Sequence, residues 1–292
     1  MIISASRRTD IAAFYTPWFM NRVRAGFCTV PNPMNRKQIS EISLAPRDVD
    51  VFVFWTRDPR PLLPHLTELD ERGFNYYFQF SLLGYPRLID PKSPSLKIAL
   101  TAFRQLAQRI GPERVIWRYD PIVFSQLTPP AHHEEQFARL AGELQGSTRR
   151  CVISVVDVYR KLQGRLRELA DTPAAFEDVP SESLHRLLER LAEIAEANGM
   201  EITSCAEAED WSSWRVPPGK CVDAGLTNRL FGLSLPNRKD PSQREACGCV
   251  ASRDIGMYDT CLFGCTYCYA TTSFARAREQ FAGHNPESPS LV

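Results

Sequence analysis

The sequence predicts an α/β protein folded as a parallel (β/α) barrel, for two reasons. Short apolar runs alternate with amphipathic helical patterns over the first 205 residues. These runs lack polar alternation, as do strands that are buried on both faces. In addition, no GxGxxG or GxxxxGK(S/T) phosphate-binding loop follows any run, which disfavours an open, doubly wound nucleotide-binding sheet. We therefore expect a partial barrel.

Six of the apolar runs are predicted to be strands. They cover residues 1–6, 51–55, 76–82, 114–118, 151–156 and 200–205. This number predicts a partial, six-stranded barrel in place of the usual eight strands. The irregular segment 211–259 is long enough to hold two more strands, so an eight-stranded barrel stays open as an alternative.

Three helices between these strands have recognisable ends. One begins at Thr16-Pro17, because proline suits the first turn of a helix, and ends at Gly26. The two others show apolar stripes with helical spacing within residues 96–110 and 184–194, and each is followed by a glycine. Helices of this kind, set between buried strands, favour right-handed crossover connections in a parallel sheet.

The regular alternation stops at Cys205, and the remaining chain is rich in proline, glycine, asparagine and cysteine. We expect residues 1–205 to form the barrel and residues 206–292 to form an irregular, cysteine-rich segment packed on it as one structural unit. The chain has 292 residues and a formal net charge of +1, which does not favour nucleic-acid binding through a basic surface. Neither a signal peptide nor a membrane-length apolar run is visible, so we expect a cytoplasmic protein without a membrane partner.

Ionisable residues cluster directly after the predicted strands. In barrels of this kind the active site lies at the carboxyl ends of the strands, although exposed strand ends carry charges in many proteins. The candidates for catalytic or substrate-binding roles are Arg7, Arg8, Asp10, Arg57, Arg118, Asp120, Asp157 and Lys161. Because guanidinium groups bind carboxylates and phosphates in a bidentate manner, the set predicts a small, anionic substrate.

Arg118 and Asp120 stand two residues apart on a strand, so their side chains should lie on the same face. A buried arginine and aspartate on one face normally pair, and such a pair serves either structure or a site. His132 and His133 open a helical pattern, which indicates surface or capping roles rather than metal ligation. Cys28 and Cys151 lie in apolar segments and are expected to be small buried residues.

The motif with the most specific chemistry is Cys261-x3-Cys265-x2-Cys268. Three thiolates on one loop suit a 4Fe-4S cluster whose fourth iron stays open. A tetrahedral zinc site with a fourth ligand and a redox dithiol are the alternatives. The cluster is favoured because Gly264 lets the backbone approach closely and Tyr267 supplies an apolar wall, although both also suit a turn.

Four further cysteines precede this motif, namely Cys205, Cys221, Cys247 and Cys249. A cysteine cluster in a cytoplasmic protein is more often metal-binding or catalytic than disulfide-bonded. One of the four could close the first cluster as a fourth ligand, or several of them could hold an auxiliary metal. Cys205 ends the sixth predicted strand, so its thiol is expected near the carboxyl ends of the strands.

The ending CLFGCTYCYA resembles the cluster loop of the radical S-adenosylmethionine (radical SAM) enzymes, especially the photolyase-like branch, which has YCYA after its cluster loop. Segments from SASRRTDI through VFVFWTRDP and VIWRYDPI to this ending also resemble an uncharacterised bacterial family, which is defined partly by its C-terminal cysteine cluster. In radical SAM enzymes the loop follows the first strand, whereas residues 7–10 occupy that place here. The family's glycine-rich segment for the methionine end of the cofactor is not recognisable.

The radical SAM resemblance implies that Cys261, Cys265 and Cys268 bind a 4Fe-4S cluster, with S-adenosylmethionine as a candidate ligand of the open iron. Reductive cleavage of that ligand would generate a substrate radical, and a flavodoxin or ferredoxin would donate the electron. Two alternatives of other classes stay open. One is an electron-transfer or structural protein whose cluster is closed by a fourth cysteine, and the other is a zinc-stabilised binding protein.

Overall fold

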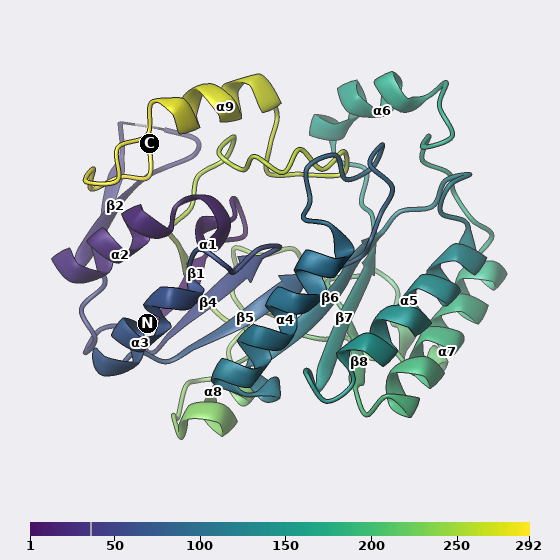
Figure 1. The fold of residues 1–292 in the computed structure, drawn as a ribbon, viewed down its shortest axis with the longest axis horizontal. Coiled ribbons are helices and arrows are strands. Elements are labelled where there is room, and N and C mark those ends of the chain that lie inside the picture. Colours follow the sequence, from purple (N-terminus) through teal and green to yellow (C-terminus); the bar gives the residue numbers. More distant parts are fainter. Residues whose placement is uncertain (36) are drawn as a thin grey trace.

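The computed structural model describes residues 1–35 and 37–292. Its centre is a seven-stranded, all-parallel sheet in the order β8-β7-β6-β5-β4-β1-β9 (Figure 1). The strands are β1 (Ile2–Ala5), β4 (Val51–Thr56), β5 (Tyr76–Ser81), β6 (Val115–Ile122), β7 (Arg150–Val155), β8 (Glu201–Ser204) and β9 (Arg253–Asp254). All six predicted strands are present, which confirms the α/β class with a parallel sheet. Parallel pairing brings their carboxyl ends to one edge of the sheet.

The sheet differs from the predicted six-stranded barrel in two ways. The seventh strand, β9, comes from the C-terminal segment and pairs with β1, with Ser4 opposite Asp254. The other edge strand is β8, and no pairing between described residues joins it to β9. The structure therefore establishes a parallel sheet, and closure into a barrel is not observed. A separate antiparallel hairpin of β2 (Phe27–Pro31) and β3 (Ile39–Ser43), which the sequence analysis did not predict, follows the first helices.

Helices lie on both faces of the sheet: most of them pack on one face, and the eighth belongs to the segment on the opposite face. They are α1 (Ile11–Phe14), α2 (Thr16–Ala25), α3 (Leu66–Glu71), α4 (Leu96–Ile110), α5 (Pro130–Leu144), α6 (Gln163–Leu169), α7 (Ser181–Ala197), α8 (Ala224–Phe231) and α9 (Phe274–Ala282). Figure 1 shows α4, α5 and α7 side by side in front of the sheet. The predicted ends of α2 are confirmed, since a proline lies in its first turn and Gly26 follows it with a φ of 80°, a left-handed conformation that glycine adopts readily.

Aromatic side chains join this face of the sheet to the helices. Phe54 on β4 contacts Phe19 of α2, and Trp117 on β6 stacks on Phe137 of α5 with ring centroids 4.7 Å apart. These side chains are fully buried, so each contributes a large hydrophobic stabilisation. The buried Cys151 on β7 belongs to the same core, as does Cys28, which confirms their predicted packing roles.

The opposite face of the sheet packs on the chain's own irregular segment. Alternate strand residues such as Val53, Tyr77 and Ile116 form a second core with residues of the segment 221–250. The Tyr77 hydroxyl donates to the backbone oxygen of Cys221 at 2.8 Å. The C-terminal segment therefore does more than extend the fold, because it buries a sheet face that would otherwise be open to water. None of the helices in residues 1–35 and 37–292 has the length and apolar character needed to span a membrane.

His133 is part of the core, and its predicted surface or capping role is wrong. Its side chain is fully buried, and its ring nitrogens lie 2.9 Å from the Tyr119 hydroxyl and 3.0 Å from the Val123 carbonyl oxygen. The carbonyl accepts from Nε2–H, so Nδ1 is the acceptor for the hydroxyl and the ring is neutral. Burial lowers the pKa of His133 from 6.5 to about 4.

Stability is therefore expected to fall as the pH is lowered. The unfolded chain protonates His133 below pH 6.5, whereas the folded chain resists protonation until about pH 4. The contribution of His133 is complete above pH 6.5 and is lost between pH 6.5 and 4, by on the order of 3 kcal/mol over the whole interval. Urea unfolding at pH 7 and pH 5 measures it, and the His133→Gln variant should lose less stability between these pH values than the natural chain. His65→Gln, at a partly exposed site, should keep the natural pH dependence; equal dependence in all three proteins contradicts the assignment.

Candidate functional site

The carboxyl ends of the strands and the C-terminal segment enclose a cavity of about 460 Å³, a size typical of small-molecule sites. Most of the predicted site residues lie in its wall. Those predicted as catalytic that line it are Arg7, Arg8, Asp10, Arg57, Arg118, Asp120 and Asp157. The cysteines that line it are Cys205, Cys221, Cys247, Cys249, Cys261, Cys265 and Cys268. The strand ends and both groups of cysteines thus meet at one place.

Cys261, Cys265 and Cys268 lie on a loop that other parts of the chain hold by its backbone. The Arg165 guanidinium donates to the carbonyl oxygens of Cys265, at 3.3 Å, and of Cys268. The backbone N–H of Thr266 donates to the Ile89 carbonyl oxygen at 3.1 Å. The thiols face the cavity from a fixed loop, which pre-organises them for ligation.

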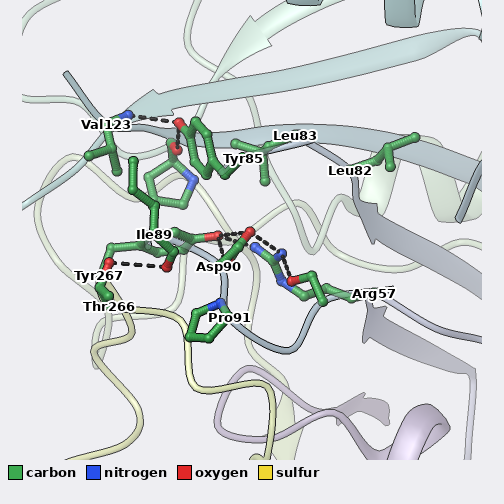
Figure 2. A network of polar contacts seen from close by, with 12 residues as sticks. Arg57, Leu82, Leu83, Tyr85, Ile89, Asp90, Pro91, Val123, Thr266 and Tyr267 are labelled. Carbon is green, nitrogen blue, oxygen red and sulfur yellow. Dashed lines mark hydrogen bonds and ion pairs between the residues drawn. The ribbon is translucent and has the colours of Figure 1, made fainter. Parts of the chain in front are cut away.

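Tyr267, between two of these cysteines, is an anchor as well as part of the cavity wall. Its hydroxyl donates to both carboxylate oxygens of Asp90 at 3.0 Å, and Arg57 contacts the same hydroxyl and lies 2.7 Å from the carboxylate. Figure 2 shows Arg57, Asp90 and Tyr267 in this network. The expected apolar wall is thus tied to the sheet by buried polar groups, because Arg57 directly follows β4.

The network extends to a second tyrosine, drawn beside Tyr267 in Figure 2. The ring of Tyr85 contacts that of Tyr267 edge to face, with centroids 5.9 Å apart. Its hydroxyl donates to the Pro121 carbonyl oxygen at 2.9 Å and accepts from the Val123 N–H at 2.8 Å. The cysteine loop is therefore connected to the end of β6 through groups whose hydrogen bonds are all satisfied.

Burial governs the chemistry of the thiols. It raises the pKa of Cys265 well above the ordinary value, although the nearby Arg57 guanidinium opposes the shift. Burial likewise raises the pKa of Cys261 to about 12, with Cys268 as the next contributor. Such thiols stay protonated at neutral pH unless a cation replaces their protons. Among the described residues, no group of three or more Cys, His, Asp or Glu side chains is arranged to hold a single metal ion.

The other four cysteines form a separate group on the same cavity. The Sγ atoms of Cys205 and Cys221 lie 3.2 Å apart, and Cys249 Sγ accepts from the Val222 N–H at 3.3 Å. The thiol of Cys249 contacts those of Cys247 and Cys221, and the thiols in each of these two pairs shift one another's pKa values. All nine cysteines of the chain are free thiols. Cys205 lies beyond β8, near the carboxyl ends of the strands, as predicted.

The predicted pair of Arg118 and Asp120 is present. The guanidinium Nε lies 3.0 Å from the Asp120 carboxylate, and the arginine is buried. Its Nη1 also donates to Gln79 at 3.4 Å and to Cys221 Sγ at 2.7 Å. Arg118 thus links the Asp120 carboxylate to the four-cysteine group. Its N–H donors are used in contacts within the protein, so fewer of them are left for a ligand.

The two arginines after β1 differ in the hydrogen bonds that their guanidinium groups make within the protein. Arg7 donates to Ser252 Oγ at 2.6 Å and lies over the Trp55 ring. Within residues 1–35 and 37–292, the Arg8 guanidinium donates only to the Gly256 carbonyl oxygen, at 3.4 Å, and it lies over the Tyr258 ring. Its guanidinium keeps most of its donors for a ligand, so Arg8 is the best placed of these arginines to bind an anion in the cavity.

The remaining predicted residues have structural contacts. Asp10 is buried and caps α1, accepting from the backbone N–H groups of Ala13 at 2.9 Å and Arg57 at 2.7 Å, and burial raises its pKa to about 7. Asp157 is exposed and pairs with Arg244. Lys161 is not part of the cavity wall and lies 4.3 Å from the centroid of the Tyr258 ring.

Several residues that build the site were missed in the sequence. Asp90 and Arg165 hold the cysteine loop, Arg244 lines the cavity, and Asp254 joins β9 to β1. Asp90 precedes a proline and reads as a turn residue, and Arg165 lies in a short helix with other charged residues. Neither residue belongs to a recognisable motif, so the local sequence carries no signal for its role. Their roles depend on contacts with residues 30 or more positions away.

One solved structure similar to this chain is described as a "putative alpha-L-fucosidase" from Bacteroides thetaiotaomicron VPI-5482. The match covers 82% of each chain at 9% sequence identity, with a TM-score of 0.29. A score this low carries no argument about fold or activity. No curated protein matches the sequence.

A family model matches residues 2–270, which include every strand of the sheet and the complete cysteine loop. Its description is "Domain of unknown function (DUF1848)". The match spans the whole site, from the arginines after β1 to Cys268. The chain belongs to the DUF1848 family.

Proposed function

We propose that this protein binds a 4Fe-4S cluster through Cys261, Cys265 and Cys268 and acts as a radical-SAM-like enzyme on a small anionic substrate. One observation carries the proposal: these three thiols, the arginines after β1 and β4, and Arg118 within β6 line the same cavity. A cluster loop beside a cationic small-molecule pocket is the arrangement that such an enzyme needs.

The residues present fit a cluster of this kind. Each thiolate of a cubane cluster binds a different iron, so the three thiols need not converge on one point, as ligands of a single ion must. The loop is held by Arg165 and by the Tyr267 network, which leaves the thiols free to ligate. The buried Arg57, whose charge acts on Cys265, offsets part of the negative charge that a thiolate-ligated cluster brings.

When bound, such a cluster supplies single electrons, which in radical SAM enzymes pass to S-adenosylmethionine on the open iron; a flavodoxin or ferredoxin is the expected donor. The chain's own contribution is to bind and orient. Arg8 has unengaged donors for a carboxylate or phosphate, whereas Arg57 and Arg118 are held by Asp90 and Asp120. We therefore assign substrate binding to Arg8 in the first place.

The test starts from protein purified without oxygen and compares the natural chain with Cys265→Ala. The natural chain should be brown, contain iron and acid-labile sulfide, and form 5′-deoxyadenosine from S-adenosylmethionine after reduction. Cys265→Ala should lose iron and abolish the product, because one of three ligands is gone. Cys151→Ala removes a buried thiol outside the cavity and is the matched control, expected to keep both.

Three outcomes overturn the proposal in different ways. A colourless protein that carries stoichiometric zinc excludes the cluster and leaves the zinc-stabilised binding protein. An intact cluster that never cleaves S-adenosylmethionine excludes the radical chemistry and leaves an electron-transfer or structural cluster. Iron bound equally well by Cys265→Ala places the cluster elsewhere in the chain.

A further inference from the structure

We propose that Cys205 and Cys221 are a redox-active dithiol, which reduces a small disulfide that enters the cavity and is itself converted to a disulfide. The Sγ atoms of the two residues lie 3.2 Å apart. A disulfide bond is about 2.05 Å long, so closing it requires a movement of roughly 1 Å. The inference goes beyond the proposed function and does not rest on it, because neither cysteine belongs to the Cys261–Cys268 loop.

The fold brings the two thiols together from separate segments of the chain. Cys205 directly follows β8, and its N–H donates to the Ile153 carbonyl oxygen on β7 at 2.9 Å. The segment before Cys221 runs beside the end of β8, since the Gly219 N–H donates to the Ser204 carbonyl oxygen at 2.9 Å. The contact between the two sulfur atoms is therefore built by backbone hydrogen bonds at the carboxyl end of the sheet.

Gly219 makes this approach possible. A Cβ atom at position 219 would lie 2.3 Å from Thr203 Oγ1 and 2.9 Å from the Ser204 carbonyl oxygen. Because the obstructing atoms include the backbone of β8, any side chain at this position would push the Cys221 segment away.

The sheet holds the backbone of Cys221 from one side. Tyr77 and Gln79 on β5 both donate to its carbonyl oxygen, at 2.8 and 2.9 Å, and both side chains are buried. With the backbone fixed, only side-chain rotation is needed to close the bond to Cys205. A reaction between groups that are already positioned in this way loses little conformational entropy.

Both thiols can be reached from the cavity. Cys205 and Cys221 line its wall, and Cys205 is partly exposed whereas Cys221 is 5% exposed. Cys28 and Cys151 differ, because they are fully buried in the helix-side core, where a thiol acts as a small apolar residue. Two adjacent thiols at a cavity wall are in contrast accessible to a small reagent.

Hydrogen bonds and charge make Cys221 the more acidic thiol of the pair. Cys205 S–H donates to Cys221 Sγ, which lowers the pKa of Cys221, and Arg118 Nη1 donates to the same sulfur at 2.7 Å. The contact with Cys249 and burial outweigh these effects and raise the pKa of Cys221 to about 11. The hydrogen bond to Cys221, together with burial, raises the pKa of Cys205 well above the ordinary value. Cys221 therefore forms a thiolate more readily, and the thiolate is the form that attacks a disulfide.

The reaction consists of two exchange steps. The Cys221 thiolate attacks one sulfur of the small disulfide, so that a mixed disulfide forms, the S–S bond of the reagent breaks, and the first thiol leaves with the proton from Cys221. Cys205 then attacks Cys221 Sγ, and the second thiol leaves with the proton from Cys205. The two protein thiols lose two electrons in all, and the small disulfide gains them.

The charge of the cavity indicates which small disulfides it admits. Arg7 and Arg8 line the same wall as the two cysteines, and guanidinium groups bind carboxylates through paired hydrogen bonds. A small disulfide that carries carboxylates fits this wall. Cystine, which has two carboxylates, is therefore the probe.

The experiment uses the full chain, purified without oxygen, reduced with dithiothreitol and freed of it. After incubation with cystine, the remaining thiols are blocked with N-ethylmaleimide and the peptides are mapped by mass spectrometry. The natural chain should contain a Cys205–Cys221 disulfide. Cys247→Ser/Cys249→Ser, which removes two other thiols of the same wall, is the matched control and should form this disulfide too. Adding Cys205→Ser to the control should stop the reaction at a mixed disulfide between Cys221 and cysteine, because the second attacking thiol is gone.

Three results overturn the proposal. The first is that both thiols of the natural chain are still blocked by N-ethylmaleimide after incubation with cystine. The second is a disulfide in the natural chain that joins Cys221 to Cys249 or Cys247. The third is a mixed disulfide on Cys221 that persists in the natural chain, because Cys205 then fails to attack it.

Arg118→Gln tests the assignment of Cys221 as the attacking thiol. Loss of the charged donor should slow the first step roughly threefold, because fewer Cys221 thiolates are present but each is a better nucleophile. Arg118→Lys keeps the charge and should react at a rate closer to that of the natural chain. If Arg118→Gln does not fold, Arg118→Gln/Asp120→Asn removes the unpaired buried carboxylate and takes its place. Equal rates in the natural chain and in the variant without the charge overturn the assignment.

Discussion

Replacing Arg57 by methionine is expected to lower the free energy of unfolding by about 3–5 kcal/mol, because a buried carboxylate loses its only cationic partner among the described residues. Asp90 is buried, with 3% of its side chain exposed, and Arg57 Nη1 lies 2.7 Å from it. The Tyr267 hydroxyl would still donate to Asp90 but carries no positive charge. Guanidinium chloride unfolding, followed by circular dichroism, measures the loss.

The matched control is Arg60→Met in the same loop. Arg60 pairs with Asp58 at 2.7 Å, but about half of its side chain is exposed, so its removal should cost less than about 1 kcal/mol. The double variant Arg57→Met/Asp90→Leu removes both charges and should be more stable than Arg57→Met alone. Equal losses for Arg57→Met and Arg60→Met, or no recovery in the double variant, contradict the role given to the buried pair.

The strands of the sheet could be predicted because their signal is local. A run such as residues 51–55 is apolar at every position, and only a strand covered on both faces explains that. The two-residue strand β9 carries Arg253 and Asp254 and has no apolar signal. It exists because Ser4 and its neighbours offer an unpaired edge, a long-range condition that no local pattern records. The same reason explains why the face packed on residues 221–250 was not foreseen.

In the candidate site, too, residues with a local sequence signal could be predicted and residues that act through long-range contacts could not. Cysteine spacing and charged strand ends identified most of the cavity wall, since the carboxyl ends of parallel strands meet at one edge. Lys161 was included by that rule, although it lies in the short helix Arg160–Leu162 and does not line the cavity. Asp90 and Arg165 were missed because each acts on the cysteine loop only through contacts that are distant in the sequence. Ligand candidates were therefore easier to predict than the residues that position them.

Asp254 ties the C-terminal segment to the first strand, and Asp254→Asn is expected to lower the free energy of unfolding by about 2–4 kcal/mol. One carboxylate oxygen accepts from Ser4 Oγ at 2.7 Å and from the Arg7 N–H at 2.9 Å. The other accepts from Ser6 Oγ at 2.6 Å and from the Gly256 N–H at 2.9 Å. Denaturant unfolding at neutral pH measures the loss.

The size of this loss follows from the asparagine amide, which has one accepting oxygen where the carboxylate has two. Serine hydroxyls can rotate, but the backbone N–H groups of Arg7 and Gly256 are fixed. Whichever way the asparagine amide turns, its NH2 group faces one of them and leaves a donor without an acceptor. Asp210→Asn is the control, because this exposed aspartate caps a short helix through Ser212, and asparagine caps equally well.

The consequence for the site should be specific to one part of the chain. Asp254 lies between Cys249 and Cys261 in the sequence, and it accepts from the backbone N–H of Arg7, which lines the cavity. Hydrogen exchange in Asp254→Asn should therefore accelerate in peptides that cover residues 253–270, before it does so in α4 and α5. Uniform acceleration across these regions would mean that Asp254 stabilises the fold as a whole. Local acceleration would mean that one carboxylate keeps the cysteine loop and the first arginines in the same site, which the proposed function requires.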